Sequence, residues 1–257
     1  MQCRICASTA DPFGQAVILA KFKVQYFRCA ECCFVQTEEP FWLNEAYSAA
    51  IASLDVGIMN RNLHNADFTA AIISLLFPSS SRYLDFAGGH GTLVRMMRDR
   101  GFDFRWCDRF AENKFARGFE HVEGQHYDLV TAYEVLEHFA HPFEEFESLL
   151  GFGENLLVST LPLPEPPPKP PDWWYYAVSS GQHVSFYSRR TLSWLADRFG
   201  LELLTHGEHH LFSRSAKNAV LFRLAVSGKT APAIGTVFRR KSLTTGDLIR
   251  ISEAAIK

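Results

Sequence analysis

An acidic residue followed by a cluster of glycines is the feature with the clearest chemical meaning. The apolar run Arg82–Phe86 predicts a short strand that carries Asp85 near its end, and a helix is expected from about His90 to Arg100. Between them stand the glycines Gly88, Gly89 and Gly91. Glycine has no Cβ, so the backbone can turn sharply and approach a ligand closely. Since ligands of open parallel sheets bind at the strand ends, beside free N–H groups of a helix start, we expect a nucleotide-type cofactor here.

The order of the small residues narrows the choice of cofactor. The turn reads Ala87-Gly88-Gly89-His90-Gly91 and lacks both the Gly-x-Gly-x-x-Gly of dinucleotide sites and the Gly-Lys-Ser/Thr ending of phosphate loops. A carboxylate directly before the turn is also a poor neighbour for a pyrophosphate. The pattern therefore favours a cofactor that has no phosphate groups and carries a positive centre.

A second acid follows the next expected strand. Phe102–Asp108 alternates between apolar and polar residues and ends in Asp108. An acid at this position can hydrogen-bond both hydroxyls of a ribose. Arg109 and Phe110 follow directly, and the phenylalanine is placed to pack against an adenine ring. Only 19 residues separate Asp108 from Asp128, so the third strand, near Gly118–Val122, must be short.

These segments resemble the class I S-adenosylmethionine-dependent methyltransferases. Their first motif is an apolar strand followed by Asp/Glu-x-Gly-x-Gly-x-Gly, and Ala87 stands in place of its first glycine. The run His126–Phe139 resembles the fourth-strand motif, which ends in Leu-Glu-His. The resemblance implies that Tyr133, Glu134 and, less directly, His138 line the methionine and methyl side of the cofactor. The residues alone favour a blander interpretation of Glu137 and His138, namely a helix start with a packed imidazole.

The remaining pattern predicts an α/β fold with a Rossmann-like seven-stranded methyltransferase sheet. Helices are expected at Pro142–Leu150 and Arg189–Phe199, with a strand at Asn155–Thr160 between them. Two further segments, Leu201–His206 and Asn218–Val226, are predicted to form an antiparallel pair of strands joined near Ser213–Lys217.

Five of the six cysteines lie in the first 33 residues. Two Cys-x-x-Cys pairs give the spacing of a zinc ribbon, and a hairpin is expected between them at Ala16–Phe27. The four expected ligands are Cys3, Cys6, Cys29 and Cys32. Four protein ligands predict a structural Zn²⁺, and the alternative is a set of reduced thiols or disulfides. A zinc-ribbon-like module beside such a domain resembles the methyltransferases of sugar and natural-product pathways.

The linker from Phe41 to Phe77 is expected to form two or three helices. Its residues Tyr47, Asp55, Gly57 and Arg61 stand where related enzymes lay a helix across the cofactor. Arg61 suits a bidentate pair with the cofactor's carboxylate, and it equally suits a surface arginine.

The acceptor side is expected after the fifth strand. The proline-rich run Leu161–Pro171 predicts either a wall of the active site or a stiff spacer, and the aromatic run 172–176 offers a stacking surface. The segment Gly181–Ser188 resembles the one that faces the acceptor in this group. His183 and Tyr187 are therefore the catalytic candidates, with His183 as general base or as a residue that only orders the loop.

The predicted domains are a zinc module (1–38), a helical linker that covers the cofactor (39–78), the methyltransferase domain (79–226) and a C-terminal tail (227–257). The chain has 257 residues, is 47% hydrophobic and 21% charged, and has a net charge of −2. There is no global basic field for nucleic acid, no apolar run of transmembrane length and no signal peptide at Met1–Arg4, which predicts a cytoplasmic protein.

The sequence thus predicts in-line methyl transfer from S-adenosyl-L-methionine to a small-molecule or glycan-type acceptor, at a hydroxyl. One alternative is a dinucleotide or sugar-nucleotide enzyme, against which the missing glycine fingerprint counts. The other is a non-catalytic scaffold that uses the zinc module to dock a partner.

Overall fold

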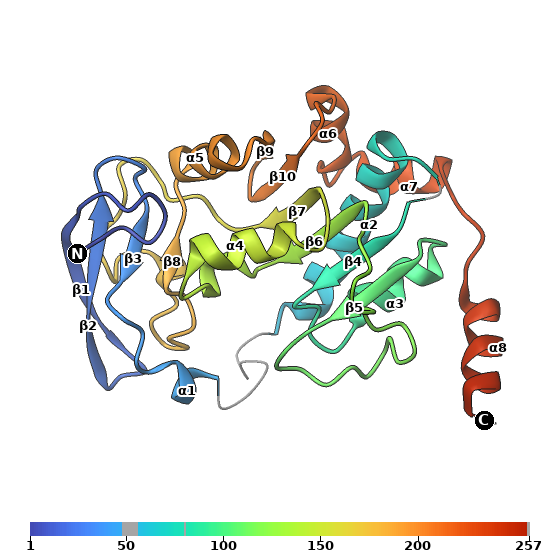
Figure 1. Ribbon diagram of the computed structural model, residues 1–257, viewed down its shortest axis with the longest axis horizontal. Helices are drawn as coiled ribbons and strands as arrows, with labels where there is room; N and C mark the ends of the chain where they lie inside the picture. Colours follow the sequence, from blue (N-terminus) through green and yellow to red (C-terminus); the bar gives the residue numbers. More distant parts are fainter. Residues whose placement is uncertain (48–55, 80, 256–257) are drawn as a thin grey trace. The chain divides into compact units, whose positions relative to one another are not determined.

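The computed structural model describes residues 1–47, 56–79 and 81–255, and the side chains of 254 and 255 are also left aside (Figure 1). Asp55 of the linker lies outside the described residues. The chain forms two compact units, each made of several segments. Unit 1 comprises Met1–Ala52, Tyr133–Leu150 and Val158–Ser215, and unit 2 comprises Ser53–Ala132, Gly151–Leu157 and Ala216–Lys257.

A six-stranded sheet has the order β5-β4-β6-β7-β10-β9. In that order its strands are Phe104–Cys107, Tyr83–Phe86, Leu129–Tyr133, Asn155–Ser159, His209–Ser213 and Glu202–His206. Strand β4 pairs in parallel with β5 and β6, and β9 pairs antiparallel with β10. A parallel bridge joins Trp106 to Glu120, inside the predicted third strand. The predicted α/β sheet is therefore present, with its third strand reduced to a bridge.

The helices of unit 2 pack around α2 (Ile58–Leu76), which contacts α3 (Thr92–Asp99), α6 (Ala219–Ala225) and α7 (Ala231–Val237). The last helix, α8 (Thr244–Ala255), carries Asp247, whose carboxylate pairs with two arginines of α3. The segment predicted as a C-terminal tail therefore contains helices, and one of them is joined to α3 by buried charges.

One predicted strand is wrong. Most of the predicted strand Asn218–Val226 forms helix α6 (Ala219–Ala225), which the Asn218 side chain caps by accepting hydrogen bonds from the N–H groups of Val220 and Leu221. The antiparallel partner of β9 is instead β10, all of whose residues are buried. The sequence did not indicate this strand because it begins with two adjacent polar residues, His209 and His210.

Unit 1 contains a four-stranded sheet of order β1-β2-β3-β8. Its strands are Ala10–Ile18, Phe22–Cys29, Val35–Thr37 and Ser185–Phe186, and the short helix α1 spans Leu43–Ala46. The predicted cysteine-module hairpin is thus confirmed as β1 and β2, and the late strand β8 completes the sheet. An aromatic core packs against it, formed by Tyr26, Trp42, Trp173, Tyr175, Tyr176 and Phe186 among others. The aromatic run predicted as a stacking surface is mostly core, and only Trp174 of these is exposed.

Two helices of unit 1 match their predicted bounds, α4 (Pro142–Leu150) and α5 (Arg189–Phe199). Ser188 and Thr191 form a capping box at the start of α5, and Gly200 ends it in the left-handed conformation. Two 3₁₀ turns, η1 (Leu136–His138) and η2 (Trp174–Tyr176), complete the unit. These short turns matter because they carry candidate site residues.

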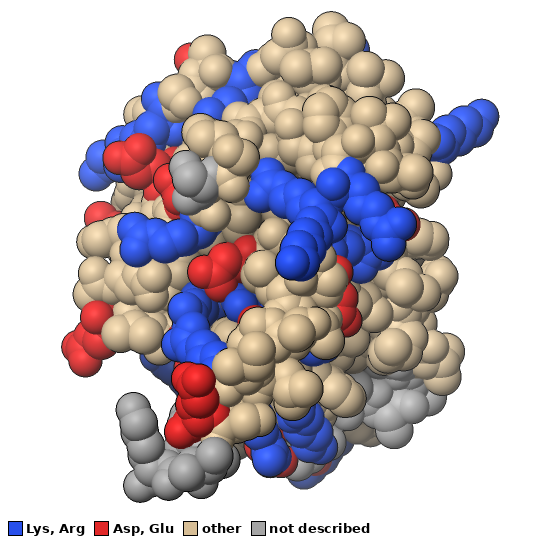
Figure 2. Space-filling view, turned by 90° about the vertical axis from the view of Figure 1, so that its right-hand side faces the viewer, with Lys and Arg blue, Asp and Glu red and all other residues tan. Residues whose placement is uncertain are grey.

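Figure 2 shows basic and acidic side chains interspersed over the face in view, with broad uncharged areas around them. Exposed or partly exposed ion pairs in the described part of the chain include Arg117–Glu112 and Arg95–Asp99. In the described part of the chain, no helix combines the length and apolar character that a membrane crossing requires.

Candidate functional site

The acid before the glycine turn is buried and tightly held. The side chain of Asp85 is 4% exposed, and its Oδ1 accepts a 2.7 Å hydrogen bond from the hydroxyl of Thr131 in β6. A Cβ on Gly88 would lie 2.6 Å from Oδ2 of the same carboxylate. Glycine is therefore required at position 88, because any side chain would strike the acid.

The rest of the turn needs left-handed backbone. Ala87, Gly89 and Gly91 have φ angles of 53°, 55° and 85°. A Cβ on Gly91 would also lie 2.9 Å from the Cβ of Ala116. Glycine adopts this region freely, whereas alanine pays a steric cost of roughly 1–2 kcal/mol. The one departure from the family motif, Ala87, is thus a strained position.

Asp108 at the end of β5 holds the turn from the other side. Its Oδ2 accepts a hydrogen bond from the N–H of Gly89 at 2.9 Å, and its Oδ1 accepts those of Phe110 and Ala111 at 2.7 and 2.8 Å. The indole of Trp106 donates to the carbonyl oxygen of Gly89 at 2.8 Å. The two acidic residues predicted to bind the cofactor, Asp85 and Asp108, therefore contact the same loop within unit 2.

The electrostatics of Asp85 follow from its burial. Burial raises the pKa of the carboxyl to about 7, with a smaller contribution from the negative charge of Asp108 and against the hydrogen bond from Thr131. A cation placed at this carboxyl would reverse that shift. The turn therefore prefers a ligand whose nearest group is positive.

The other predicted cofactor residues are more open. Phe110 is 71% exposed, and Arg109 and Arg61 are exposed too, the latter on α2. Tyr133 and Glu134 are half-buried at the end of β6. These two arginines and the aromatic ring are exposed, and exposure alone does not mark them as part of a binding site.

Glu134 adopts a strained backbone directly after β6. Its φ is 55°, and its N–H donates to Ser159 Oγ at 2.9 Å. The same hydroxyl donates back to Glu134 Oε1 at 2.6 Å. Strain of this kind gathers at functional sites when the surrounding structure enforces it, as this reciprocal pair does.

A second cluster lies within unit 1 and joins residues far apart in the sequence. Glu137 is fully buried, and its Oε1 accepts a 2.7 Å hydrogen bond from the phenol of Tyr175. The rings of His138 and His183 meet edge to face with centroids 4.9 Å apart. Glu137 and His138 do lie in a short helical turn, as the favoured interpretation had it, but they also share this cluster with His183.

Each imidazole of the cluster is oriented by a backbone carbonyl. His183 Nδ1 lies 2.7 Å from the carbonyl oxygen of Tyr175. His138 Nδ1 lies 3.2 Å from that of Gln182 and 2.9 Å from the phenol of Tyr47. A carbonyl only accepts hydrogen bonds, so Nδ1 of His183 carries the proton and its lone pair is on Nε2. Nδ1 of His138 can donate to the Gln182 carbonyl or accept from the nearer Tyr47 phenol, so these contacts permit either tautomer. The sequence indicated Tyr175 only as part of the aromatic run 172–176, and its hydrogen bond to Glu137 appears only in the fold.

Burial shifts the acid–base properties of the cluster. It raises the pKa of Glu137 to about 8, with help from the charge of Glu134. It lowers the pKa of His138 to about 3, with help from His183, and that of His183 to about 4. Both imidazoles are therefore neutral at pH 7.

Tyr187, the second catalytic candidate, is placed differently from the prediction. Its ring is buried against Phe34 with centroids 5.1 Å apart, and its phenol donates to the carbonyl oxygen of Leu136 at 3.0 Å. The hydroxyl is used to hold η1. The catalytic role of Tyr187 stays a prediction.

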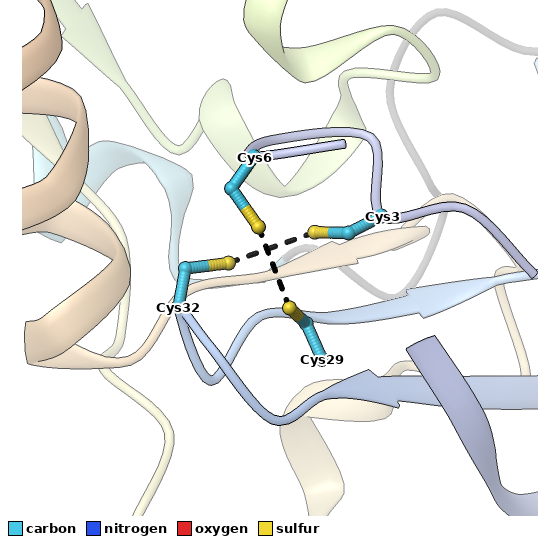
Figure 3. Close-up of side chains that lie close together, drawn as sticks. All are labelled: Cys3, Cys6, Cys29 and Cys32. Atoms are coloured by element: carbon cyan, nitrogen blue, oxygen red, sulfur yellow. Dashed lines mark hydrogen bonds between the residues drawn. The ribbon is translucent and has the colours of Figure 1, made fainter. Parts of the chain in front are cut away.

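The four predicted cysteine ligands come together in unit 1 (Figure 3). The Sγ atoms of Cys3 and Cys32 are 3.6 Å apart, those of Cys6 and Cys29 are 3.5 Å apart, and none is in a disulfide. All four sulfurs lie within 4.8 Å of one another. The hydrogen bond from Cys32 lowers the pKa of the Cys3 thiol to about 5.

The loops that carry the cysteines are alike. The residue after each second cysteine, Ala7 and Cys33, takes a left-handed φ of 61° and 59°. The carbonyl oxygen of Cys32 accepts the Thr191 hydroxyl at 2.8 Å, which ties the second loop to the start of α5. Cys33 thus shapes the loop, while its thiol is outside the four-sulfur cluster.

The profile of a known family, described as a methyltransferase domain, matches residues 59–206. That span covers more than half of the chain and includes the glycine turn, Asp108 and the Glu137 cluster. The chain belongs to the methyltransferase domain family. The predicted class, an S-adenosylmethionine-dependent methyltransferase, is confirmed by this match.

Several solved methyltransferase structures are similar to this methyltransferase at low identity. TnmH is 19% identical with a TM-score of 0.48, over 66% of this chain and 60% of its own. An O-methyltransferase family protein from Burkholderia thailandensis is 17% identical with a TM-score of 0.44, over 68% of each chain. Human N-acetylserotonin methyltransferase, in complex with SAM, is 14% identical with a TM-score of 0.42, over 68% of this chain and 66% of its own. A comparison with curated proteins finds no match.

Proposed function

We propose that this methyltransferase moves the methyl group of S-adenosyl-L-methionine to a hydroxyl of a small-molecule or glycan-type acceptor. The proposal rests on one observation, namely that the glycine turn contacts the carboxylates of both Asp85 and Asp108. Gly88 is pressed against Asp85, and Gly89 is bonded to Asp108. The first carboxyl is deprived of water and favours a positive ligand, which the sulfonium and ammonium groups of this cofactor supply.

The cofactor residues take the following roles in the proposal. Asp85 and the turn hold the methionine end, and Asp108 accepts hydrogen bonds from the ribose hydroxyls. Phe110 offers an exposed aromatic face to the adenine, with Arg109 beside it. Arg61 pairs with the cofactor's carboxylate, and Tyr133 and Glu134, which follow the strand that carries Thr131, line the methyl side.

The reaction needs little covalent help from the protein. The acceptor oxygen forms a bond to the methyl carbon, the carbon–sulfur bond breaks, and its electron pair stays on sulfur to give S-adenosylhomocysteine. The hydroxyl proton is released. The protein aligns oxygen, carbon and sulfur and keeps water away. A pKa of about 4 makes His183 by itself a weak base. We therefore propose that Glu137, His138 and His183 act together on the hydroxyl group of the acceptor.

The four cysteines are proposed to hold a structural Zn²⁺. A tetrahedral ion with zinc–sulfur bonds of about 2.3 Å places its sulfurs about 3.8 Å apart, close to the pairs in Figure 3. Four protein ligands leave no open position for a substrate. The zinc would therefore stabilise the hairpin of unit 1 and take no part in methyl transfer.

The test is the formation of S-adenosylhomocysteine from S-adenosyl-L-methionine in the presence of a panel of sugars, phenols and other hydroxyl compounds. We expect product with some members of the panel and none with His183→Ala, while His121→Ala, which changes a histidine outside the cluster, keeps the activity. A protein that binds the cofactor but methylates no member of the panel would favour the scaffold function.

A further inference from the structure

The Glu137 cluster has the composition of a metal site, separate from the four cysteines. Glu137, His138 and His183 each offer one ligand atom, and the three atoms lie within 4.8 Å of one another. We infer that these residues form a binding site for a divalent transition-metal ion. The inference of the site stands on this geometry alone, and only the role of the ion rests on the proposed function.

The first support is a buried oxygen that has no partner. Glu137 Oε1 accepts the Tyr175 phenol, but Oε2 is buried and makes no hydrogen bond. Within the described part of the chain, no lysine or arginine forms an ion pair with this carboxylate. A buried acceptor without a partner costs about 1–3 kcal/mol, and more if the group is charged. A bound cation would satisfy this oxygen and its charge together.

The second support is the orientation of the two imidazoles. The carbonyl oxygen of Tyr175 fixes the proton on Nδ1 of His183, so that its Nε2 keeps a lone pair, and the Gln182 carbonyl and the Tyr47 phenol hold the ring of His138. Histidine ligands of metals are commonly oriented in this way by a carbonyl or carboxylate on the other nitrogen.

A third support is the negative charge that surrounds the cluster. Glu134 lies close enough to Glu137 for the charges of the two side chains to interact, so two acidic groups lie close together here. Each would be stabilised by a cation placed between Glu137 and the imidazoles. Glu134 is held in its strained backbone by the Ser159 hydroxyl, which keeps its charge near the cluster.

The donor set selects the kind of ion. Two imidazole nitrogens and one carboxylate oxygen suit Mn²⁺, Fe²⁺, Co²⁺, Ni²⁺ or Zn²⁺, whereas Mg²⁺ and Ca²⁺ prefer oxygen ligands alone. Three protein ligands leave positions open for a substrate, unlike the closed four-cysteine site. Given the proposed function, the acceptor's hydroxyl would bind the ion at one of these open positions. The ion would lower the pKa of the hydroxyl, so that its proton passes to water before methyl transfer.

The inference is tested by titrating Co²⁺ into the full-length protein purified with zinc. We expect one further equivalent to bind with weak visible bands of nitrogen and oxygen ligation, without the strong charge-transfer absorption of a thiolate site. Glu137→Gln and His183→Ala should each weaken this binding at least as much as the 10–100-fold loss typical of supporting residues. His121→Gln is the matched control, because His121 is a half-buried histidine that bonds to the Tyr127 hydroxyl outside the cluster.

Absence of saturable Co²⁺ binding other than to thiolates, or binding that both cluster variants retain, overturns the metal site. Thermal unfolding of the variants shows whether they fold. Calorimetry with S-adenosylhomocysteine on the same samples separates this inference from the proposed function, since cofactor binding does not require Glu137. Loss of metal with intact cofactor binding in Glu137→Gln is the expected pattern.

Discussion

The N–H of Gly89 donates a 2.9 Å hydrogen bond to the carboxylate of Asp108, so the end of β5 fixes the turn that follows β4. The same carboxylate caps its own loop through the N–H groups of Phe110 and Ala111. An anion that accepts three backbone hydrogen bonds is well ordered before any ligand arrives. The proposed ribose site is therefore built in advance, which reduces the entropy that binding must cost.

Replacing Asp108 should abolish this arrangement. Asp108→Ala removes both the proposed ribose contact and the anchor of Gly89, and we expect affinity for S-adenosylhomocysteine to fall by about 100-fold, or roughly 2.7 kcal/mol. Glu112→Ala is the control, because Glu112 is exposed and pairs only with Arg117 at the surface. Calorimetry measures both affinities, and an Asp108→Ala protein that binds normally would refute the ribose assignment.

Cofactor binding should depend on pH through Asp85. Its folded-state pKa of about 7 exceeds the ordinary 3.8, so the carboxyl stabilises the ligand-free fold at low pH and loses that contribution as the pH rises toward 7. A cationic ligand requires the ionised form. Affinity should therefore rise with pH up to about 7, by at most about tenfold per pH unit for one proton, and then level off.

The matched variant for this pH effect is Asp85→Asn. It keeps the size of the side chain and cannot ionise, so its affinity should be weak and flat with pH. A wild-type affinity that does not change between about pH 5.5 and pH 7.5 would show that Asp85 does not face a positive group of the cofactor.

Ala87→Gly should stabilise the protein. The substitution restores the motif's first glycine at φ 53° and removes the steric cost of a left-handed alanine, although glycine loses more entropy on folding. We expect a gain of up to about 1 kcal/mol in the free energy of unfolding by urea. Ala70→Gly inside helix α2 has no such strain to relieve and should cost about 1 kcal/mol. Equal losses in both variants would argue against strain at Ala87.

Loss of one cysteine ligand should release the structural zinc. Cys32→Ser is expected to lose bound zinc and to lower the melting temperature by about 5–10 °C, since metal binding contributes directly to folding free energy. Cys33→Ser changes the neighbouring thiol, which is outside the cluster, and should keep one equivalent of zinc. Elemental analysis decides the matter, and full zinc content in Cys32→Ser would contradict the proposed ligand set.

The C-terminal helix should depend on a buried ion pair. Asp247 is 5% exposed and makes two contacts with Arg98, at 2.9 and 2.7 Å. Burial opposes ionisation, but Arg98 and Arg95 together hold the pKa of Asp247 below its usual value. Asp247→Ala leaves Arg98 only partly paired and should lower the free energy of unfolding by about 2 kcal/mol. In the wild-type protein the same stabilisation should be lost as the pH falls below about 4 and Asp247 becomes protonated.

The control for that prediction is Glu112→Ala. Glu112 is exposed and pairs with Arg117 at the surface, an arrangement that contributes only about 0.5 kcal/mol. Urea unfolding of the two variants should therefore differ clearly, and an equally small effect in both would show that α8 is not held by its buried charge.

Local signals made much of the fold predictable. Ser188 and Gly200 bound α5 because capping depends on adjacent residues, and the strand, acid and glycines of β4 form a contiguous motif. Strand β10 escaped prediction because its polar residues are buried. His210 fits there only through hydrogen bonds to Thr205 and to the carbonyl oxygen of Thr160, which lies 50 residues away.

The candidate site also contains one part that could be predicted from local sequence and one part that could not. Asp85 and Asp108 follow strands directly, so their positions could be read from the sequence. The Glu137 cluster depends on Tyr175, 38 residues from Glu137, and on the pairing of His138 with His183. Such contacts are made by tertiary packing, and no periodicity in the sequence announces them.

Binding of S-adenosylhomocysteine to the wild-type protein is the most direct test of the central claim. Calorimetric titration of the full chain, with NAD as the comparison ligand, should show saturable binding at one site per chain for S-adenosylhomocysteine and none for NAD. Folded, zinc-containing protein that binds neither ligand, or that binds NAD instead, would contradict the assignment of the glycine turn as a methyl-donor site.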